Sequence, residues 1–450
     1  MMRDASFLGT QPVSRLLWKF SVPAITGTVI TALYNVVDSI FVGQGIGELA
    51  LTAVTVAFPV QTLLMAFGML IGVGSANIIS IRLGQGRTDR AEGILGNAFT
   101  LMFAIMVITT GVFLWYLDPL LRDFMGVDPA VLPYAHDFIS IILLGSVFQH
   151  IGFGINNVIR AQGDPRTALE TQIIAGIINV ILNYLFVFTF QWGISGSALA
   201  TVLAQAVAAL WVAWYFIWGP AVLNLRWKYL RPRLHSILDI VKIGCSPFMM
   251  QLAATAVMVV FNVKIQFYGG VTAVAAYGII NRLMMLIFMP VVGISMGAQP
   301  ILGFNFGARK YDRVLHTLRL ALLAATGVSI LGFIIAEVFP QEIIRIFNDS
   351  PDLLRVGTRA MRIYLVMTPV VGSSIIAGNY FQAVNKPLFS LFFTINRQVF
   401  FLIPCVYLFS SFLGLDGIWL AGAVSDGAAF IVTTAALVYN VRQIKKQIRS

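Results

Sequence analysis

The sequence predicts an all-α polytopic membrane protein with twelve transmembrane helices in two pseudo-symmetric six-helix bundles. Three observations lead to this fold class: the composition, the number of long apolar stretches and an internal repeat. Of the 450 residues, 58% are hydrophobic and only 11% are charged, whereas soluble domains carry roughly a quarter charged residues. The mean hydropathy of +0.85 indicates that most of the chain lies in a bilayer. Helices are the expected spanning element, because each satisfies its own backbone hydrogen bonds where no water is available.

Twelve apolar stretches are each long enough to cross the hydrocarbon as a helix, which needs about 20 residues. No small-residue cleavage site follows the first stretch, so we expect a retained helix rather than a signal peptide. Proline lies inside several stretches, and Pro23 in the first is a candidate hinge because proline removes a helical hydrogen bond. The predicted spans are 15–42, 51–82, 93–117, 131–160, 166–190, 193–219, 238–268, 271–304, 314–339, 357–383, 388–412 and 416–441.

The two halves of the chain resemble each other, which indicates that a six-helix unit was duplicated. The segment 71–90 aligns without gaps on 294–313, and further matches such as Pro23 with Pro247 recur at offsets of 222 to 224 residues. An even number of spans gives both copies the same orientation, which is the parallel-repeat plan of several transporters. The predicted domains are therefore an N-terminal bundle at 1–219, a basic cytoplasmic linker at 220–237 and a C-terminal bundle at 238–450.

The distribution of basic residues predicts the orientation, because cytoplasmic loops carry an excess of Lys and Arg. Placing the N-terminus inside puts most basic groups in the cytoplasm and leaves the opposite loops acidic or nearly uncharged, so we expect both termini to be cytoplasmic. The net charge of +11 is spread between the spans, which argues against nucleic acid as a partner. The cytoplasmic groups are Arg82, Arg87 and Arg90; Arg160 and Arg166; Arg226, Lys228, Arg231 and Arg233; Arg309, Lys310 and Arg313; Lys386; and Arg442, Lys445, Lys446 and Arg449.

One carboxylate, Asp38, lies in the middle of the apolar run "LYNVVDSIFVG". A charge at mid-span costs about 2.5–3.5 kcal/mol on insertion scales and usually marks a functional site. Asn179 and Asn183 are spaced i, i+4 and share a helix face, and Thr201 adds a hydroxyl. These oxygens could hold Na⁺ at Asp38, Asn179, Asn183 and Thr201, or could hydrogen-bond a protonated Asp38. The alternatives are a structural role for Asp38 and helix–helix hydrogen bonding for Asn179 and Thr201.

A second group of residues suits an adaptable cavity for substrates, because aromatic and polarizable methionine side chains can repack around different molecules. Ordinary packing or lipid-facing positions are the alternative for each of them. Lys264, Arg282 and Arg397 are basic residues within spans, and Asp426 could neutralise one of them, although no spacing selects which. The cavity candidates are Tyr34, Phe148, Gln149, His150, Phe153, Met249, Met250, Met284, Met285 and Arg282.

A series of motifs in chain order resembles the MATE family of multidrug and toxic compound extruders, in its DinF-like branch. They are "YNVVDSIFVG", "LGQGRTDRAE", "RAQGDPRTAL", "INVILNYLFVF", "GISGSALAT", "MPVVGISMGAQPILGFNFGARKYDR" and "FLIPCVYLF". The resemblance implies cation-driven export, with Asp38 as the coupling carboxylate beside Asn179 and Thr201. Asn183 stands where the family often has a second carboxylate, so a single negative charge is expected there, which favours H⁺ over Na⁺ as the coupling ion.

The expected function is a cation-coupled antiporter, driven by H⁺ or Na⁺, that exports cationic or amphipathic drugs and toxins by alternating access. The alternative is a flippase of a lipid-linked precursor, although a pyrophosphate would call for more cations than Lys264 and Arg282. We expect no enzyme, because HExxH and nucleophile-elbow motifs are absent, and no cofactor. The expected partners are small-molecule substrates and the bilayer, and the expected setting is a monomer in a bacterial-type cytoplasmic (inner) membrane.

Overall fold

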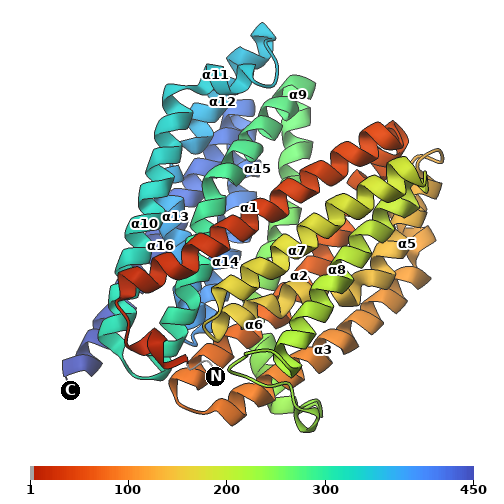
Figure 1. Cartoon of the computed structure of the whole chain (residues 1–450). Coiled ribbons are helices and arrows are strands. Elements are labelled where there is room, and N and C mark those ends of the chain that lie inside the picture. The colour runs from red at the N-terminus through yellow and green to blue at the C-terminus, as the bar shows by residue number, and fades with distance from the viewer. Residues whose placement is uncertain (1–4, 450) are drawn as a thin grey trace. The chain divides into compact units, whose positions relative to one another are not determined.

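The computed structural model describes residues 5–449, and within that range the chain is helical with no strand (Figure 1). Ten helices there are long and apolar enough to cross a membrane. One of them, α9 (Leu234–Gly307), contains two spans that meet at Gly270, whose backbone is not helical (φ 63°, ψ −161°). A further span is a pair of helices, Pro351–Leu365 and Thr368–Ala383, bent by 46°. The predicted twelve spans are thus confirmed, and most predicted limits lie within a few residues of the helix ends. The larger differences are the last helix, which continues to Arg449 beyond the predicted 441, and the bent span, which begins at Pro351 before the predicted 357.

The chain divides into two compact units that do not follow the chain order strictly. Unit 1 consists of Thr26–Phe248 and the described residues before Gln11, and unit 2 consists of Gln11–Ile25 and Met249–Ser450. Helix α1 (Val13–Gly45) and helix α9 therefore each contribute residues to both units. The domain limits predicted from the repeat, 1–219 and 238–450, remain a prediction.

In unit 1, α5 packs against α8, α7 packs against α8, and α2 packs against both α3 and α5 (Figure 1). Short π-helical segments form part of two spans of this unit, Leu132–Ala161 and Pro165–Thr189. The remaining elements of this unit are η1 (Ala5–Gly9), α2 (Glu48–Gly84), α3 (Thr88–Trp115), α4 (Leu117–Pro119), η2 (Leu120–Phe124), α5 (Leu132–Gln149), η3 (His150–Gly154), α6 (Asn156–Ala161), α7 (Pro165–Tyr184), η4 (Leu185–Thr189), α8 (Gly193–Ile217) and η5 (Trp227–Tyr229).

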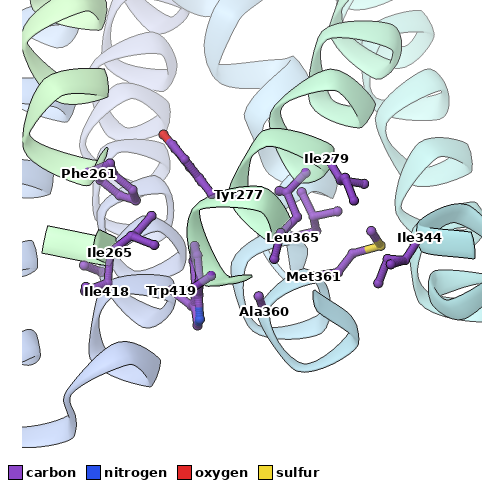
Figure 2. Packing of buried hydrophobic residues seen from close by; sticks show 14 of the residues in the cluster. Phe261, Ile265, Tyr277, Ile279, Ile344, Ala360, Met361, Leu365, Ile418 and Trp419 are labelled. Atoms are coloured by element: carbon purple, nitrogen blue, oxygen red, sulfur yellow. The ribbon is translucent and has the colours of Figure 1, made fainter. Parts of the chain in front are cut away.

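In unit 2, α10 packs against α13, and α16 packs against α12, α13 and α15. A buried apolar cluster that includes Phe261, Tyr277 and Trp419 joins α9, α12 and α16 (Figure 2). The elements after α9 are α10 (Tyr311–Val338), α11 (Pro340–Arg345), α12 (Pro351–Leu365), α13 (Thr368–Ala383), α14 (Pro387–Ile395), η6 (Asn396–Leu402), α15 (Ile403–Leu413) and α16 (Leu415–Arg449).

Glycine allows the closest helix crossings in each unit, as is common between membrane helices. In unit 1, a Cβ atom on Gly74 would lie 2.3 Å from the carbonyl oxygen of Ile240, and one on Gly244 would lie 1.7 Å from that of Leu70. In unit 2, a Cβ atom on Gly297 would lie 2.7 Å from the backbone nitrogen of Ser21. The first stretch of α9 thus packs on α2, and the first stretch of α1 packs on the second span of α9.

The predicted linker at 220–237 is held against unit 1 by hydrogen bonds from its backbone amides to side chains of α3. The amide of Asn224 donates to the Glu92 carboxylate at 3.1 Å, and the amide of Arg233 donates to the Asn97 side-chain oxygen at 2.6 Å. Arg226 also forms an ion pair with Glu92 at 3.3 Å. The basic loop is therefore a fixed part of unit 1 rather than a loose connection.

Candidate cation-coupling site

Three helices of unit 1 bring the polar residues of the site together. Helix α1 carries Asp38, and helix α7 carries a polar stripe of Gln172, Asn179 and Asn183, whose spacing places them on one face. Helix α8 presents Ser197 and Thr201, which are also spaced i, i+4. Because α7 packs against α8, the polar faces of these helices meet inside the unit, where the hydrocarbon cannot satisfy them.

The Asp38 carboxylate accepts two hydrogen bonds on the same oxygen, Oδ1. The donors are the side-chain amide of Asn183 and the hydroxyl of Ser197, the latter at 3.3 Å. Both donors are buried, and Ser197 is fully inaccessible. The carboxylate is the acceptor in each bond, so this arrangement satisfies the ionised form of Asp38.

Asn179 and Thr201 lie in the same region but bond to each other. The Asn179 side-chain amide donates to the Thr201 hydroxyl at 3.2 Å. The predicted site residues are therefore neighbours, with Asn183 in direct contact with Asp38 and the Asn179–Thr201 pair one helical turn away along α7 and α8. Ser197 was not predicted as a site residue. It lies one turn before Thr201 in the motif "GISGSALAT", so the two residues share one face of α8.

Three buried oxygens of the α7 stripe have no hydrogen-bond partner in the described part of the chain, and these are Oε1 of Gln172, Oδ1 of Asn179 and Oδ1 of Asn183. Leaving a buried acceptor unpaired costs about 1–3 kcal/mol, so a ligand that supplies positive charge or a donor is favoured here. No cluster of three His, Cys, Asp or Glu residues occurs within residues 5–449, which argues against a transition-metal site. One carboxylate with amide and hydroxyl oxygens instead fits a hard monovalent cation or a proton.

The helix α1 residues around Asp38 are packed closely against α7. One turn before Asp38, Tyr34 faces Gly176, where an added Cβ would lie 3.8 Å from its ring. One turn after it, Phe41 forms edge contacts with Tyr184 and Phe188, with ring centroids 6.4 and 5.5 Å apart. Aromatic rings thus cover α1 on the C-terminal side of the carboxylate, while Tyr34 lies on its N-terminal side.

Further cavity candidates of unit 1 lie on α5 and η3. His150 is 1% exposed, and its ring nitrogens face the carbonyl oxygens of Ser146 (2.6 Å) and Leu64. Gln149 has a buried side-chain oxygen without a hydrogen-bond partner in the described chain. Phe148 is exposed and Phe153 is half-buried. Their role in binding substrates remains a prediction.

The cavity candidates of unit 2 lie on α9. Met250 and Met285 are exposed, Met249 is half-buried, and Met284 packs against the apolar cluster of Figure 2. The Arg282 guanidinium lies over the Phe347 ring, 5.7 Å from its centroid. A role for these residues in substrate binding also remains a prediction.

Of Lys264, Arg282 and Arg397, the three basic residues within the predicted spans, one is paired with Asp426. Lys264 lies over the ring of Tyr407, 4.2 Å from the centroid, and Arg397 forms the ion pair with Asp426, with 2.7 Å between Nε and Oδ1. The sequence had left this choice open, because the pair joins two different spans.

Comparison with known proteins gives one family for both halves of the chain. The family model MatE matches residues 23–185 and again residues 247–408, in agreement with the predicted duplication. The multidrug export protein MepA of Staphylococcus haemolyticus is 24% identical over 431 residues, covering 96% of this chain and 94% of the relative. MepA of Staphylococcus aureus strain MSSA476 is 23% identical, covering 90% and 89%. A crystal structure of MATE in the bent conformation has a TM-score of 0.93 and 22% identity, and all of both chains is covered.

Proposed function

Because this chain belongs to the MatE family of membrane transporters, we propose that it is a cation-coupled antiporter that exports cationic and amphipathic drugs by alternating access. Membership makes it a multi-pass transporter of the multidrug export class and not an enzyme. The named MepA relatives are multidrug export proteins. The coupling ion, the substrates and the residues that link them are the content of the proposal.

The observation that carries the proposal is the environment of Asp38. Its ionised carboxylate is bonded by Asn183 and Ser197, and the unpaired oxygens of Asn179 and Asn183 lie beside it. Protonation would turn Asp38 from an acceptor into a donor as well, and the unpaired amide oxygens could receive that hydrogen bond. The two forms of Asp38 thus call for different pairings of the same side chains.

This difference in hydrogen bonding couples the protonation of Asp38 to the conformation of α1. A ligand shifts a conformational equilibrium only by its differential affinity for the two states. Protonation of Asp38 favours the packing of α1 in which the carboxyl group donates, and loss of the proton favours the packing described above. Pro23 lies inside α1 and permits a bend, because the helix lacks one hydrogen bond there. Export follows when substrate binding and proton binding favour opposite packings, so that uptake of the proton drives release of the substrate.

We propose H⁺ rather than Na⁺ as the coupling ion. Asn183 contributes an amide in place of a second carboxylate, so the site holds one negative charge, which a single proton neutralises. The proposal also places the protein in a bacterial-type cytoplasmic membrane as a monomer, with both termini in the cytoplasm. A flippase ranks lower because a pyrophosphate would call for more cations within the spans than Lys264 and Arg282 provide.

Reconstitution into liposomes tests the function directly. The uptake of a cationic dye is measured under a pH gradient and, separately, under a Na⁺ gradient, with Asp38→Asn protein as the control. We expect movement driven by the pH gradient in the wild type and none in the variant. Strict dependence on Na⁺ at a constant pH gradient would reject H⁺ coupling, and the absence of movement under either gradient would reject coupled export.

A further inference from the structure

Unit 2 contains a second charged group within its spans, the ion pair of Arg397 and Asp426. Arg397 lies in η6, near the middle of the span Pro387–Leu413, and Asp426 lies in α16, within the span Leu415–Ile448. Their side chains are 30% and 12% exposed. Charges at this depth are expensive and usually mark ligand or ion pathways. The coupling reaction proposed for Asp38 makes no use of this pair.

The Arg397 guanidinium uses only one edge of its fork. The bond from Nε to Asp426 Oδ1, 2.7 Å long, is its single hydrogen bond to any residue in the described chain. Neither amino group is among the buried polar atoms that lack a partner. The two Nη groups are therefore accessible, and the outer N–H of each forms the parallel pair of donors that can bind a carboxylate bidentately.

The surroundings of the pair combine aromatic rings with polar groups. Tyr364 of α12 lies one helical turn from Asp426, because a Cβ atom on Gly422 would lie 2.4 Å from its ring. The same ring packs edge-on against Trp419, with centroids 6.3 Å apart. The ring of Tyr277 meets the ring of Tyr364 edge-on, with centroids 6.3 Å apart. Tyr277 and Trp419 are themselves buried, at 5% and 1% exposed, so these rings hold Tyr364 in place beside the pair.

We propose that Arg397 binds a carboxylate group on transported molecules, with Asp426 as its resident counter-ion. This inference rests on the proposed export function and assigns the side chain that recognises the carboxylate of those substrates that carry one. Asp426 neutralises Arg397 between transport cycles, since an unpaired buried charge would be strongly destabilising. Asp426 accepts the hydrogen bond from Nε of Arg397, and the substrate carboxylate binds the two Nη groups. Asp426 also repels that carboxylate, which keeps its binding reversible.

Rhodamine B and its ethyl ester form a matched pair of probes, because they differ only in whether the carboxylate is free. Binding of each dye to the purified full chain in nanodiscs is measured by fluorescence anisotropy without an ion gradient. We expect Asp426→Asn to bind rhodamine B about tenfold more tightly, because the like charge is removed. The double variant Arg397→Gln with Asp426→Asn should bind it about tenfold more weakly than the wild type. The affinity for the ester should change less than twofold in both variants.

Arg355→Gln with Asp352→Asn is the control, since it neutralises another ion pair of unit 2, whose members are 82% and 79% exposed. Arg397→Lys keeps the charge but not the fork, and we expect intermediate binding of rhodamine B. Thermal melting of each variant separates loss of the fold from loss of the site. A double Arg397–Asp426 variant that melts earlier but keeps the wild-type ratio of the two affinities would show a purely structural ion pair and overturn the proposal.

The same measurements separate this proposal from the export function. If the wild type binds and exports the ester while neither it nor Asp426→Asn binds rhodamine B, the carboxylate site is rejected and export of cations stands. If the wild type binds neither dye, the proposed multidrug function fails and the carboxylate site fails with it.

Discussion

At the scale of single residues, the site is defined by which hydrogen-bond donors reach Asp38. Asn183 and Ser197 do so directly, and Thr201 contacts Asn179 instead. Each of these side chains comes from a different position along α7 or α8, so individual substitutions can separate charge, hydrogen bonding and packing.

Replacing Asp38 by Asn keeps the size of the side chain and removes its titration. We expect gradient-driven dye export to fall to the level of empty vesicles, while the melting temperature stays nearly unchanged, because a neutral amide is cheaper to bury than a charge. Asp123→Asn, at an exposed carboxylate of the same unit, serves as the control and should export normally. An Asp38→Asn protein that pumps at the wild-type rate would leave Asp38 with a structural role only.

Replacing Ser197 by Ala removes one of the two donors to Asp38. Hydrogen bonds to charged groups contribute about 1.5–3 kcal/mol, so we expect the initial rate of export to fall about tenfold without being abolished. Ser75→Ala is a matched control, because Ser75 is equally buried but donates only to carbonyls of its own helix. Equal rates for the two variants would show that the Ser197 hydroxyl has no part in coupling.

At the scale of helices, close crossings at glycine fix how the spans can rotate. Gly244 of α9 meets the backbone of α2 at Leu70, and Gly74 of α2 meets the backbone of α9 at Ile240. Each helix thus supplies a glycine where the other presents a carbonyl group. Backbone atoms cannot move aside as a flexible side chain can, so this contact tolerates little change.

Replacing Gly244 by Ala should destabilise unit 1, because the new Cβ would lie 1.7 Å from the Leu70 carbonyl oxygen. Overpacking of this kind costs about 1–3 kcal/mol. We expect a clear fall in melting temperature, measured by size-exclusion chromatography of heated, detergent-solubilised protein. Gly111→Ala in α3 is the control, since no atom lies within 4 Å of its added Cβ. Similar melting of Gly244→Ala and wild type would mean that the α2–α9 crossing is looser than described.

At the scale of the whole molecule, the chain is built from two copies of one unit. The MatE model matches both halves, and an equivalent close contact recurs in each: Gly74 packs near α9 in unit 1, and Gly297, its counterpart in the repeat, packs against α1 in unit 2. An even number of spans in each half predicts the same orientation for both, so one labelling experiment on the segment between them tests the predicted topology.

The segment between the halves should be accessible only from the cytoplasm. Trp227 is 87% exposed, so Trp227→Cys in a chain lacking Cys245 and Cys405 offers a single reactive thiol. A membrane-impermeant maleimide should label it in broken cells and leave it unlabelled in intact cells. Ile346→Cys, at an exposed position between α11 and α12, should show the opposite pattern of access. Labelling of residue 227 in intact cells would invert the proposed orientation.

Much of the fold could be predicted from the sequence, because hydropathy acts locally along the chain. Each span needs a long apolar stretch wherever it lies in the bundle, and a kinked span such as α12–α13 still reads as one stretch. Glycine and proline mark several helix ends: one helix ends at Gly84, and two others begin at Pro165 and Pro387. The importance of Asp38 was predictable for the same reason, since a carboxylate inside a long apolar stretch is visible in the local sequence and is costly in hydrocarbon.

The tertiary structure alone decided which residues meet. The sequence left Asp426 without a partner, and only the packing of η6 against α16 selects Arg397. The sequence predicted that Thr201 would lie beside Asp38, whereas the rotation of α8 places Ser197 in contact with Asp38 instead. It also gave no sign that α1 and α9 each contribute to both packing units. These contacts depend on how each helix rotates and where two helices cross, and both are fixed by side chains on other helices far away in the chain.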